Sequence, residues 1–116
     1  MGRLTTHVLD TAQGCPAAGV AVALYRIEPE RELLAQAQTN GDGRLDTPIL
    51  EAESFSAGVY ELVFEAGDYF RTSSMELPDP PFVDSVVLRF GIADANAHYH
   101  VPLLVSPWSY STYRGS

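Results

Sequence analysis

The segment that decides the fold is His98–Ser116, which reads HYHVPLLVSPWSYSTYRGS. It opens with two histidines two positions apart, continues through the apolar run Val101–Val105, breaks at Ser106-Pro107, and returns as Ser109–Ser116. A run, a break and a second run predict a β-hairpin. The second run is unusually polar, since it brings several hydroxyl groups, a tyrosine and an arginine within reach of the two imidazoles. The hairpin is therefore a candidate functional site.

The rest of the chain alternates short apolar runs with turns. Further strands are expected at Leu4–Asp10, Val20–Ile27, Glu32–Thr39, Gly58–Phe64 and Val83–Phe90. Val20–Ile27 is almost continuously apolar, which predicts burial on both faces. Glu32–Thr39 contains good helix formers, but it lies between a proline break and the turn Asn40–Gly43, and this spacing favours an antiparallel strand. One short helical segment is expected within Glu65–Ser74.

Seven or eight short strands, frequent turns and at most one brief helix are typical of an antiparallel β-sandwich. The 116 residues suit a single domain covering the whole chain, residues 1–116. The sequence therefore predicts an all-β protein in which two sheets pack face to face.

Charge and composition exclude several kinds of partner. Seven basic residues against fifteen acidic ones give a net charge of −8, which argues against nucleic acid or an anionic membrane as the main partner. No apolar stretch approaches the roughly 20 residues of a membrane span. Cys15 is the single cysteine, so no intrachain disulfide forms. With strand-like sequence starting directly after Met1, we expect a cytoplasmic protein.

The chain contains three histidines, His7, His98 and His100. His98 and His100 share one face of a strand, because side chains repeat every second residue. Neutral imidazoles activate water and then protonate a leaving group, and a guanidinium such as that of Arg44 binds oxygen-rich substrates or a developing oxyanion. The commoner alternatives are a surface or hydrogen-bonded histidine and a solvated arginine.

Other chemistries have weaker support. Three histidines also satisfy the ligand count of a zinc hydrolase, although nothing in the sequence places His7 near the other two. No G-x-S-x-G motif is present, and Cys15 has no adjacent histidine. The residues alone thus predict a β-sandwich with a candidate histidine–arginine hydrolytic site, and they identify no substrate.

Three separated motifs resemble one known family. YSTYRGS, preceded by HVPLLVSP, resembles the C-terminal signature of the 5-hydroxyisourate hydrolases, the transthyretin-related proteins of purine catabolism. LTTHVLDTAQGCPA is similar to the opening motif of that family, and GRLDTP to its central arginine segment. The resemblance spans almost the whole chain. It implies two four-stranded antiparallel sheets, one short helix after Gly58–Phe64, and a homotetramer with sites between subunits.

The resemblance also implies a reaction and its residues. The reaction is hydrolytic ring opening of 5-hydroxyisourate to 2-oxo-4-hydroxy-4-carboxy-5-ureidoimidazoline, without cofactor or metal. By motif position, the catalytic residues would be His7, Arg44 and His100. The substrate-binding residues would be His7, Arg44, Tyr113, Arg114, Gly115 and Ser116. His98 falls outside the motif.

The implied mechanism uses two histidines and one arginine of the motifs. His7 and His100 would position and deprotonate a water that attacks a ring carbonyl, and Arg44 would stabilise the tetrahedral oxyanion. The main alternative is a transthyretin-like carrier that binds small aromatic ligands without catalysis. A metal hydrolase and a monomeric interaction module are further alternatives.

Overall fold

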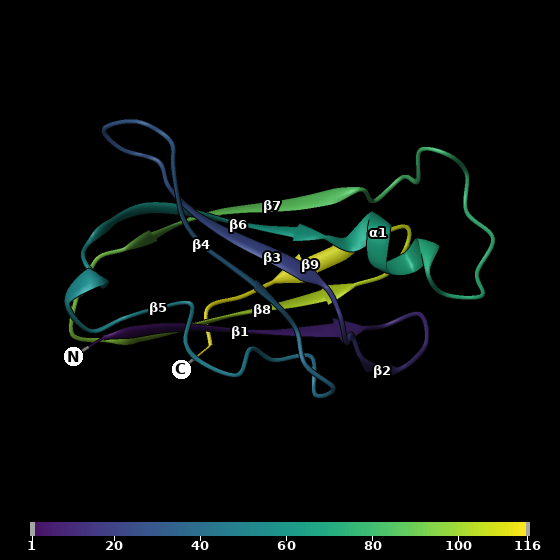
Figure 1. Cartoon of the computed structure of the whole chain (residues 1–116), viewed down its shortest axis with the longest axis horizontal. Helices are drawn as coiled ribbons and strands as arrows, with labels where there is room; N and C mark the ends of the chain where they lie inside the picture. Colours follow the sequence, from purple (N-terminus) through teal and green to yellow (C-terminus); the bar gives the residue numbers. More distant parts are fainter. Residues whose placement is uncertain (1, 116) are drawn as a thin grey trace.

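The computed structural model describes residues 2–115, which form two β-sheets packed face to face (Figure 1). The first sheet contains β1 (Arg3–Asp10), β2 (Cys15–Pro16), β5 (Leu50–Glu51), β8 (His98–Val105) and β9 (Tyr110–Thr112). The second contains β3 (Ala21–Arg26), β4 (Glu32–Gln38), β6 (Gly58–Glu65) and β7 (Ser85–Ile92). Helix α1 (Ala66–Arg71) follows β6, and a 3-10 turn occupies Ala52–Ser54. The predicted all-β sandwich with one short helix is confirmed.

Strand pairing agrees with the predicted hairpin and adds one unexpected pair. β8 and β9 pair antiparallel, with Leu103 opposite Thr112. β4 is a strand that pairs antiparallel with β3, as its position before the Asn40–Gly43 turn predicts. β1 and β8, however, pair in parallel along their whole length. Two neighbouring strands that enter from the same end need a long connection, and here it runs through the second sheet.

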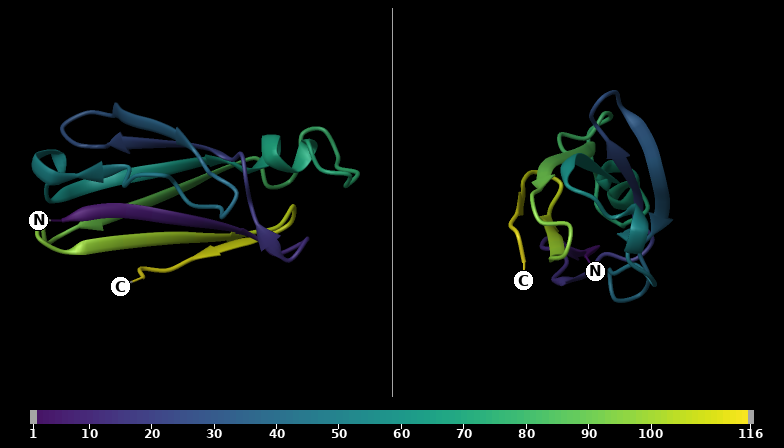
Figure 2. Two further views of the ribbon diagram at one scale, coloured as in Figure 1. Left: turned by 60° about the horizontal axis from the view of Figure 1, so that its bottom comes forward. Right: turned by 90° about the vertical axis from the view of Figure 1, so that its left-hand side faces the viewer.

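The core lies between the two sheets, as the edge-on views show (Figure 2). β1 and β8 contribute alternate residues from the first sheet, and β3, β6 and β7 contribute them from the second. The largest fully buried side chains are those of Leu4, Val8, Val20, Val22, Leu24, Tyr60, Leu62, Phe64, Phe70, Val86, Leu103 and Val105. Because each sheet buries one face only, its other face remains available for a site.

Burial of the Val20–Ile27 segment on both faces is wrong. In β3, Val22 and Leu24 are buried, whereas Ala21 is exposed and Tyr25 is half-buried. No further layer covers the outer face of this sheet within residues 2–115, so the apolar run reflects small residues rather than double burial. The Tyr25 ring is covered instead by the guanidinium of Arg31, 3.7 Å from the ring centroid.

A buried carboxylate fixes the end of β1. Asp10 is 1% exposed, and its Oδ1 accepts hydrogen bonds from the backbone N–H groups of Ala12 and Gln13, both at 2.9 Å. Its Oδ2 accepts the hydroxyl of Tyr69 in α1 at 2.8 Å. Burial and this bond to Asp10 raise the pKa of Tyr69 above its usual value. The contact ties β1 to the helix and so holds the position of the strand that carries His7.

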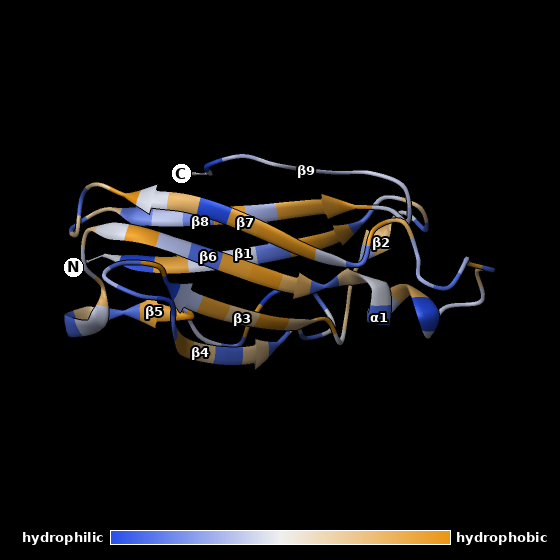
Figure 3. Ribbon diagram, turned by 90° about the horizontal axis from the view of Figure 1, so that it is seen from above, coloured by the Kyte–Doolittle hydropathy of each residue, from blue (hydrophilic) through white to orange (hydrophobic). Residues whose placement is uncertain are grey.

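Hydropathy along the first sheet separates its two halves. The first halves of β1 and β8 are mainly hydrophilic, and apolar residues follow as Val8-Leu9 in β1 and Val101–Val105 in β8, so the polar residues of the two strands lie mostly at the end away from α1 (Figure 3). No helix among residues 2–115 combines the length and the apolar content needed to cross a membrane.

Candidate active site

The outward face of the first sheet collects the polar side chains of two strands. In β1, Leu4, Thr6 and Val8 point into the core, so Arg3, Thr5 and His7 point outward. In β8 the same alternation places His98 and His100 outward. The parallel register sets Arg3 opposite His98 and Thr5 opposite His100. Pairing of strands far apart in sequence therefore brings the histidines of the two motifs onto one surface.

Arg44 joins this surface through a tight turn. The Asn40–Gly43 turn returns the chain alongside β1. There the Val8 N–H donates to the Gly43 carbonyl at 2.8 Å, and the backbones of Arg44 and His7 form an isolated antiparallel β-bridge. Gly43 has φ +75°, and a Cβ there would lie 2.3 Å from the carbonyl oxygen of Val8. Only glycine fits this approach, so Gly43 sets the place at which Arg44 meets the sheet.

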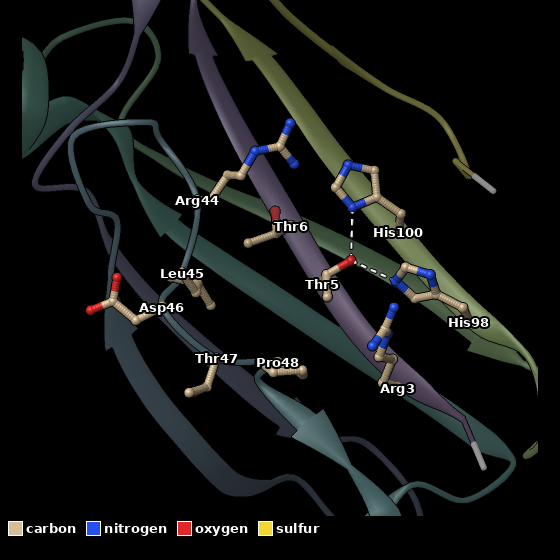
Figure 4. Close-up of a pocket in the computed structure, with 10 residues that line it drawn as sticks. All are labelled: Arg3, Thr5, Thr6, Arg44, Leu45, Asp46, Thr47, Pro48, His98 and His100. Atoms are coloured by element: carbon tan, nitrogen blue, oxygen red, sulfur yellow. Dashed lines mark hydrogen bonds between the residues drawn. The ribbon is translucent and has the colours of Figure 1, made fainter.

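A pocket of about 450 Å³ lies between Arg44 and the two histidines of β8. Its lining residues are Arg3, Thr5, Thr6, Arg44, Leu45, Asp46, Thr47, Pro48, His98 and His100. Arg44 and His100 come from opposite flanks of β1, and the Arg44 side chain extends across the strand toward His100, while Thr5 lies between the imidazoles of His98 and His100 (Figure 4). A cavity of this size with a few convergent polar groups is typical of a small-molecule site.

Hydrogen bonds hold the imidazoles in defined orientations. The Thr5 hydroxyl lies 2.8 Å from Nδ1 of His100 and 2.9 Å from Nε2 of His98. His7 lies beside the pocket, and its Nε2 donates to the carbonyl oxygen of Asp42 at 2.9 Å. In neutral His7 this bond places the proton on Nε2 and leaves Nδ1 as a proton acceptor.

The electrostatics of the pocket favour a neutral His100. Burial, followed by the positive guanidinium of Arg44 and the imidazoles of His7 and His98, lowers the pKa of His100 below its usual value. Each of these causes disfavours the charged ring. The lowered pKa therefore favours the neutral ring of His100, which is the state that a general base requires.

The C-terminal tail contacts His100 through its backbone. The Gly115 N–H donates to the His100 carbonyl at 2.6 Å, and a Cβ on Gly115 would lie 2.9 Å from Cδ2 of the ring. Tyr113 and Arg114 line a different cavity of about 390 Å³ between β7 and the tail. There the Arg114 guanidinium lies 4.1 Å from the centroid of the Tyr99 ring.

The structure thus brings together part of the predicted site. His7, Arg44, His100 and the backbone of Gly115 meet on one face, whereas Tyr113 and Arg114 point into the second cavity. Ser116 lies outside the described residues, so its predicted contact with substrate stays a prediction.

Sequence reasoning missed Arg3 and Thr5, which line the pocket. The signal for them was present, since they share the face of His7 by the two-residue period of β1.

The arginines divide into two groups by their ion pairs. Within residues 2–115, the arginines paired with carboxylates are Arg26, Arg31, Arg71 and Arg89. Arg3, Arg44 and Arg114 have no such partner among these residues. Two of these three, Arg3 and Arg44, line the pocket, so in a protein of net charge −8 the pocket offers an oxygen-rich ligand two guanidinium groups that no carboxylate of the described residues pairs with.

The three histidines were also candidates for metal ligands. In the described part of the chain, no group of three or more His, Cys, Asp and Glu side chains is arranged to hold a metal ion. The ring centroids of His98 and His100 are 6.4 Å apart, and both rings bind the Thr5 hydroxyl.

Fold and pocket together define a class: a two-sheet β-sandwich with a histidine–arginine pocket, suited to general base chemistry, on the outer face of one sheet. The chain belongs to the HIUase/Transthyretin family, whose model matches residues 4–115.

Individual relatives agree with this assignment. The 5-hydroxyisourate hydrolase of Pseudomonas aeruginosa is 63% identical over 117 residues, covering 100% of this chain and 93% of the relative. The solved structure of Klebsiella pneumoniae 5-hydroxyisourate hydrolase is 38% identical, with a TM-score of 0.82 and full coverage of both chains. A crystal structure of (S)-allantoin synthase is 49% identical with a TM-score of 0.95; it covers 99% of this chain, which spans 44% of that longer one.

Proposed function

We propose that the protein hydrolyses 5-hydroxyisourate to 2-oxo-4-hydroxy-4-carboxy-5-ureidoimidazoline. The observation that carries the proposal is the oriented imidazole of His100, whose pKa is lowered, in the same pocket as the guanidinium of Arg44, which has no carboxylate partner within residues 2–115. Attack of water on a carbonyl carbon requires a base to deprotonate the water and a positive group, here a guanidinium, to polarise the carbonyl oxygen. The names of the relatives from Pseudomonas aeruginosa and Klebsiella pneumoniae support the same reaction.

In the proposed mechanism, His100 and His7 act on the attacking water. Thr5 occupies Nδ1 of His100, so Nε2 is the nitrogen that meets the water, and His7 offers Nδ1 because its Nε2 is bound to Asp42. Arg44 binds the substrate oxygens and stabilises the oxyanion of the tetrahedral intermediate. The reaction is proposed to need no metal, because two imidazoles and a guanidinium supply the base and the electrostatic stabilisation.

The test is an ultraviolet assay in which urate oxidase generates 5-hydroxyisourate in place. Since this intermediate decays spontaneously, the signal is acceleration of its decay by the protein, measured with and without a chelator. Acceleration that survives the chelator supports the proposal. Acceleration that the chelator abolishes and zinc restores supports a metal hydrolase instead. A folded protein that binds small aromatic ligands and gives no acceleration is a carrier.

The pH profile follows from the lowered pKa of His100. A lowered pKa means that the neutral base persists to lower pH, so the contribution of His100 is lost only as pH falls through that lowered value. We expect no loss of kcat/KM attributable to His100 above pH ~6.5, the usual pKa of imidazole, and a fall beneath it. Stopped-flow assays from pH 5 to 8 measure the acid limb, and a midpoint above the usual imidazole pKa contradicts the assignment of His100 as base.

Gly115→Ala tests the packing of the tail against the base. The added Cβ would lie 2.9 Å from Cδ2 of His100, which forces the ring or the tail to move. We expect kcat to fall by up to about tenfold, the effect of an off-rotamer ring that costs roughly 0.5–1.5 kcal/mol. Gly91→Ala is the matched control, because a Cβ at Gly91 meets nothing within 4 Å. Equal activity of the two variants would show that the tail does not position His100.

We further propose that the protein assembles as a homotetramer whose pockets lie between subunits. Two observations support assembly: within residues 2–115, β7 and β9 are edge strands that pair with a neighbour on one side only, and large apolar side chains are exposed. The side chains concerned are those of Leu33, Phe82, Val87, Trp108, Tyr110 and Tyr113. Sizing chromatography with light scattering gives the oligomeric state, and a monomer would contradict the proposal.

A cytoplasmic location is proposed on the single free cysteine, Cys15, which is exposed and suits a reducing compartment. Cell fractionation with an antibody to the protein tests it.

A further inference from the structure

One hydroxyl group lies between the two histidines of β8. Thr5 Oγ1 is 2.8 Å from Nδ1 of His100 and 2.9 Å from Nε2 of His98, as the dashed lines of Figure 4 show. The parallel register places Thr5 directly opposite His100, and His98 follows two residues earlier on the same face. His98 has no assigned role in the mechanism above, although it lines the same pocket.

The hydroxyl couples the protonation of the two rings. Among residues 2–115 the Thr5 hydroxyl has hydrogen-bond partners only in these two rings, so its single proton goes to one imidazole nitrogen while its oxygen accepts an N–H from the other. If Thr5 donates to His98, then Nδ1 of His100 carries a proton and donates to Thr5. If Thr5 donates to His100, then Nδ1 of His100 is unprotonated and Nε2 of His98 carries the proton. The two bonds therefore make the tautomers of His98 and His100 interdependent.

Only the first arrangement suits a base. With the proton of neutral His100 on Nδ1, its Nε2 has a free lone pair for the attacking water. In the second arrangement the proton of neutral His100 is on Nε2, and the ring is a donor at the position where a base is needed. A protonated His98 always donates from Nε2 and so imposes the second arrangement.

We propose that Thr5 and His98 are positioning residues that set the tautomer of His100, with neutral His98 holding His100 as a base and protonated His98 converting it to a donor. The proposal deepens the proposed hydrolase function and rests on it for its kinetic consequences. Its structural part is independent, because a tautomer is observable without substrate. In the conversion one proton from solvent binds Nε2 of His100, the Nδ1 proton of His100 passes to Thr5, and the Thr5 proton passes to Nε2 of His98, so that His98 becomes the cation and His100 stays neutral.

The charges around the two rings support the switch. His100 faces Arg44 from the segment beside β1, His7 from β1 and His98 from its own strand, and together with burial they lower its pKa. Arg3 stands opposite His98, and Asp46 also lines the pocket. The groups around His100 therefore favour its neutral ring, the state in which the position of its single proton decides whether Nε2 is an acceptor.

The direct test is nuclear magnetic resonance of protein labelled with ¹⁵N-histidine, which has only three histidines to assign. We expect the proton of His100 on Nδ1 at neutral pH in the natural protein. Thr5→Val removes the hydroxyl while keeping the branched side chain, and we expect it to move the proton to Nε2. Thr5→Ser restores the hydroxyl and should restore the Nδ1 proton. A proton on Nδ1 of His100 in both Thr5→Val and the natural protein overturns the proposal.

Kinetics supply the second readout. Thr5→Val should lower kcat roughly tenfold, about the contribution of one neutral hydrogen bond, with little change in KM, and Thr5→Ser should recover it. Thr11→Val is the control, because it removes a hydroxyl that bonds the Val105 carbonyl at the other end of β1. Equal loss in Thr5→Val and Thr5→Ser would attribute the effect to packing and overturn the role of the hydroxyl.

The pH profile isolates His98. His98→Phe should lower kcat, because Thr5 loses the ring that accepts its proton and donates to Nδ1 of His100 instead. If His98 must be neutral for activity, the variant also lacks one titrating group, and the acid limb of log kcat/KM for its residual activity becomes shallower by one proton. An unchanged slope overturns the switch. Should the natural protein show no hydrolysis, the proposed function fails, whereas the tautomers measured in Thr5→Val and Thr5→Ser still decide whether Thr5 sets the state of His100.

Discussion

Replacing His100 by glutamine is expected to lower kcat by a factor of about 10²–10⁴, the usual contribution of a general base. The physical reason is that His100 presents a neutral ring, bound at Nδ1 by Thr5, to the pocket that it shares with Arg44. Glutamine retains polar atoms of similar reach but does not accept a proton at neutral pH. The loss should therefore appear in kcat, with KM changing little.

Two comparisons make the His100 result decisive. His7→Gln should also lower kcat, since Nδ1 of His7 is the second acceptor beside the pocket. Thermal unfolding of both variants separates loss of chemistry from loss of fold. Near-normal turnover in both folded variants would show that neither imidazole is the base.

Replacing Arg44 by methionine is expected to lower kcat/KM by about 10²–10³, which is the typical effect of removing one donor to an oxyanion. Within residues 2–115, Arg44 has no carboxylate partner, so its guanidinium is free to bind the substrate. Arg44→Lys keeps the positive charge but lacks the planar guanidinium, so its kcat/KM should lie between that of Arg44→Met and that of the natural protein. Rates of 5-hydroxyisourate decay, measured at several substrate concentrations, give kcat/KM for each variant.

The matched control for Arg44 is Arg26→Met. Arg26 lies in β3 of the other sheet, and its ion pair with Glu32 spans 3.4 Å between partly exposed side chains. This substitution changes the net charge by the same amount and lies away from the pocket. If Arg26→Met and Arg44→Met reduced kcat/KM equally, the effect would be one of overall charge, and the role of Arg44 would be refuted.

Much of the fold was predictable because short-range patterns carry it. The run and break of His98–Ser116 predicted the β8–β9 hairpin, and the position of Glu32–Gln38 before a glycine turn predicted a strand. Burial of Val20–Ile27 was predicted wrongly, because an apolar composition does not reveal whether another layer covers the sheet. That depends on where the remaining elements pack.

The candidate site was predictable in its residues and not in its arrangement. His7, Arg44 and His100 were selected from motifs, and their grouping required a parallel pairing of β1 with β8 across more than ninety positions. Tyr113 and Arg114 belong to the same motif as Gly115, yet they point into the cavity between β7 and the tail. Tyr113 and Arg114 lie between the end of β9 and the bridge of Gly115 to His100, outside any strand, so membership of one motif does not imply membership of one pocket.

The sequence by itself determined the class of fold, the family to which the chain belongs and the chemical types of the polar residues, because strand period, turns and motifs are local properties of the chain. Only the tertiary structure decided which side chains share a surface. It placed the Thr5 hydroxyl between His98 and His100, a contact that depends on strand register and on distances of 2.8 and 2.9 Å. Hydrogen bonds and pKa shifts act over a few ångströms, and those distances exist only once the sheets have packed.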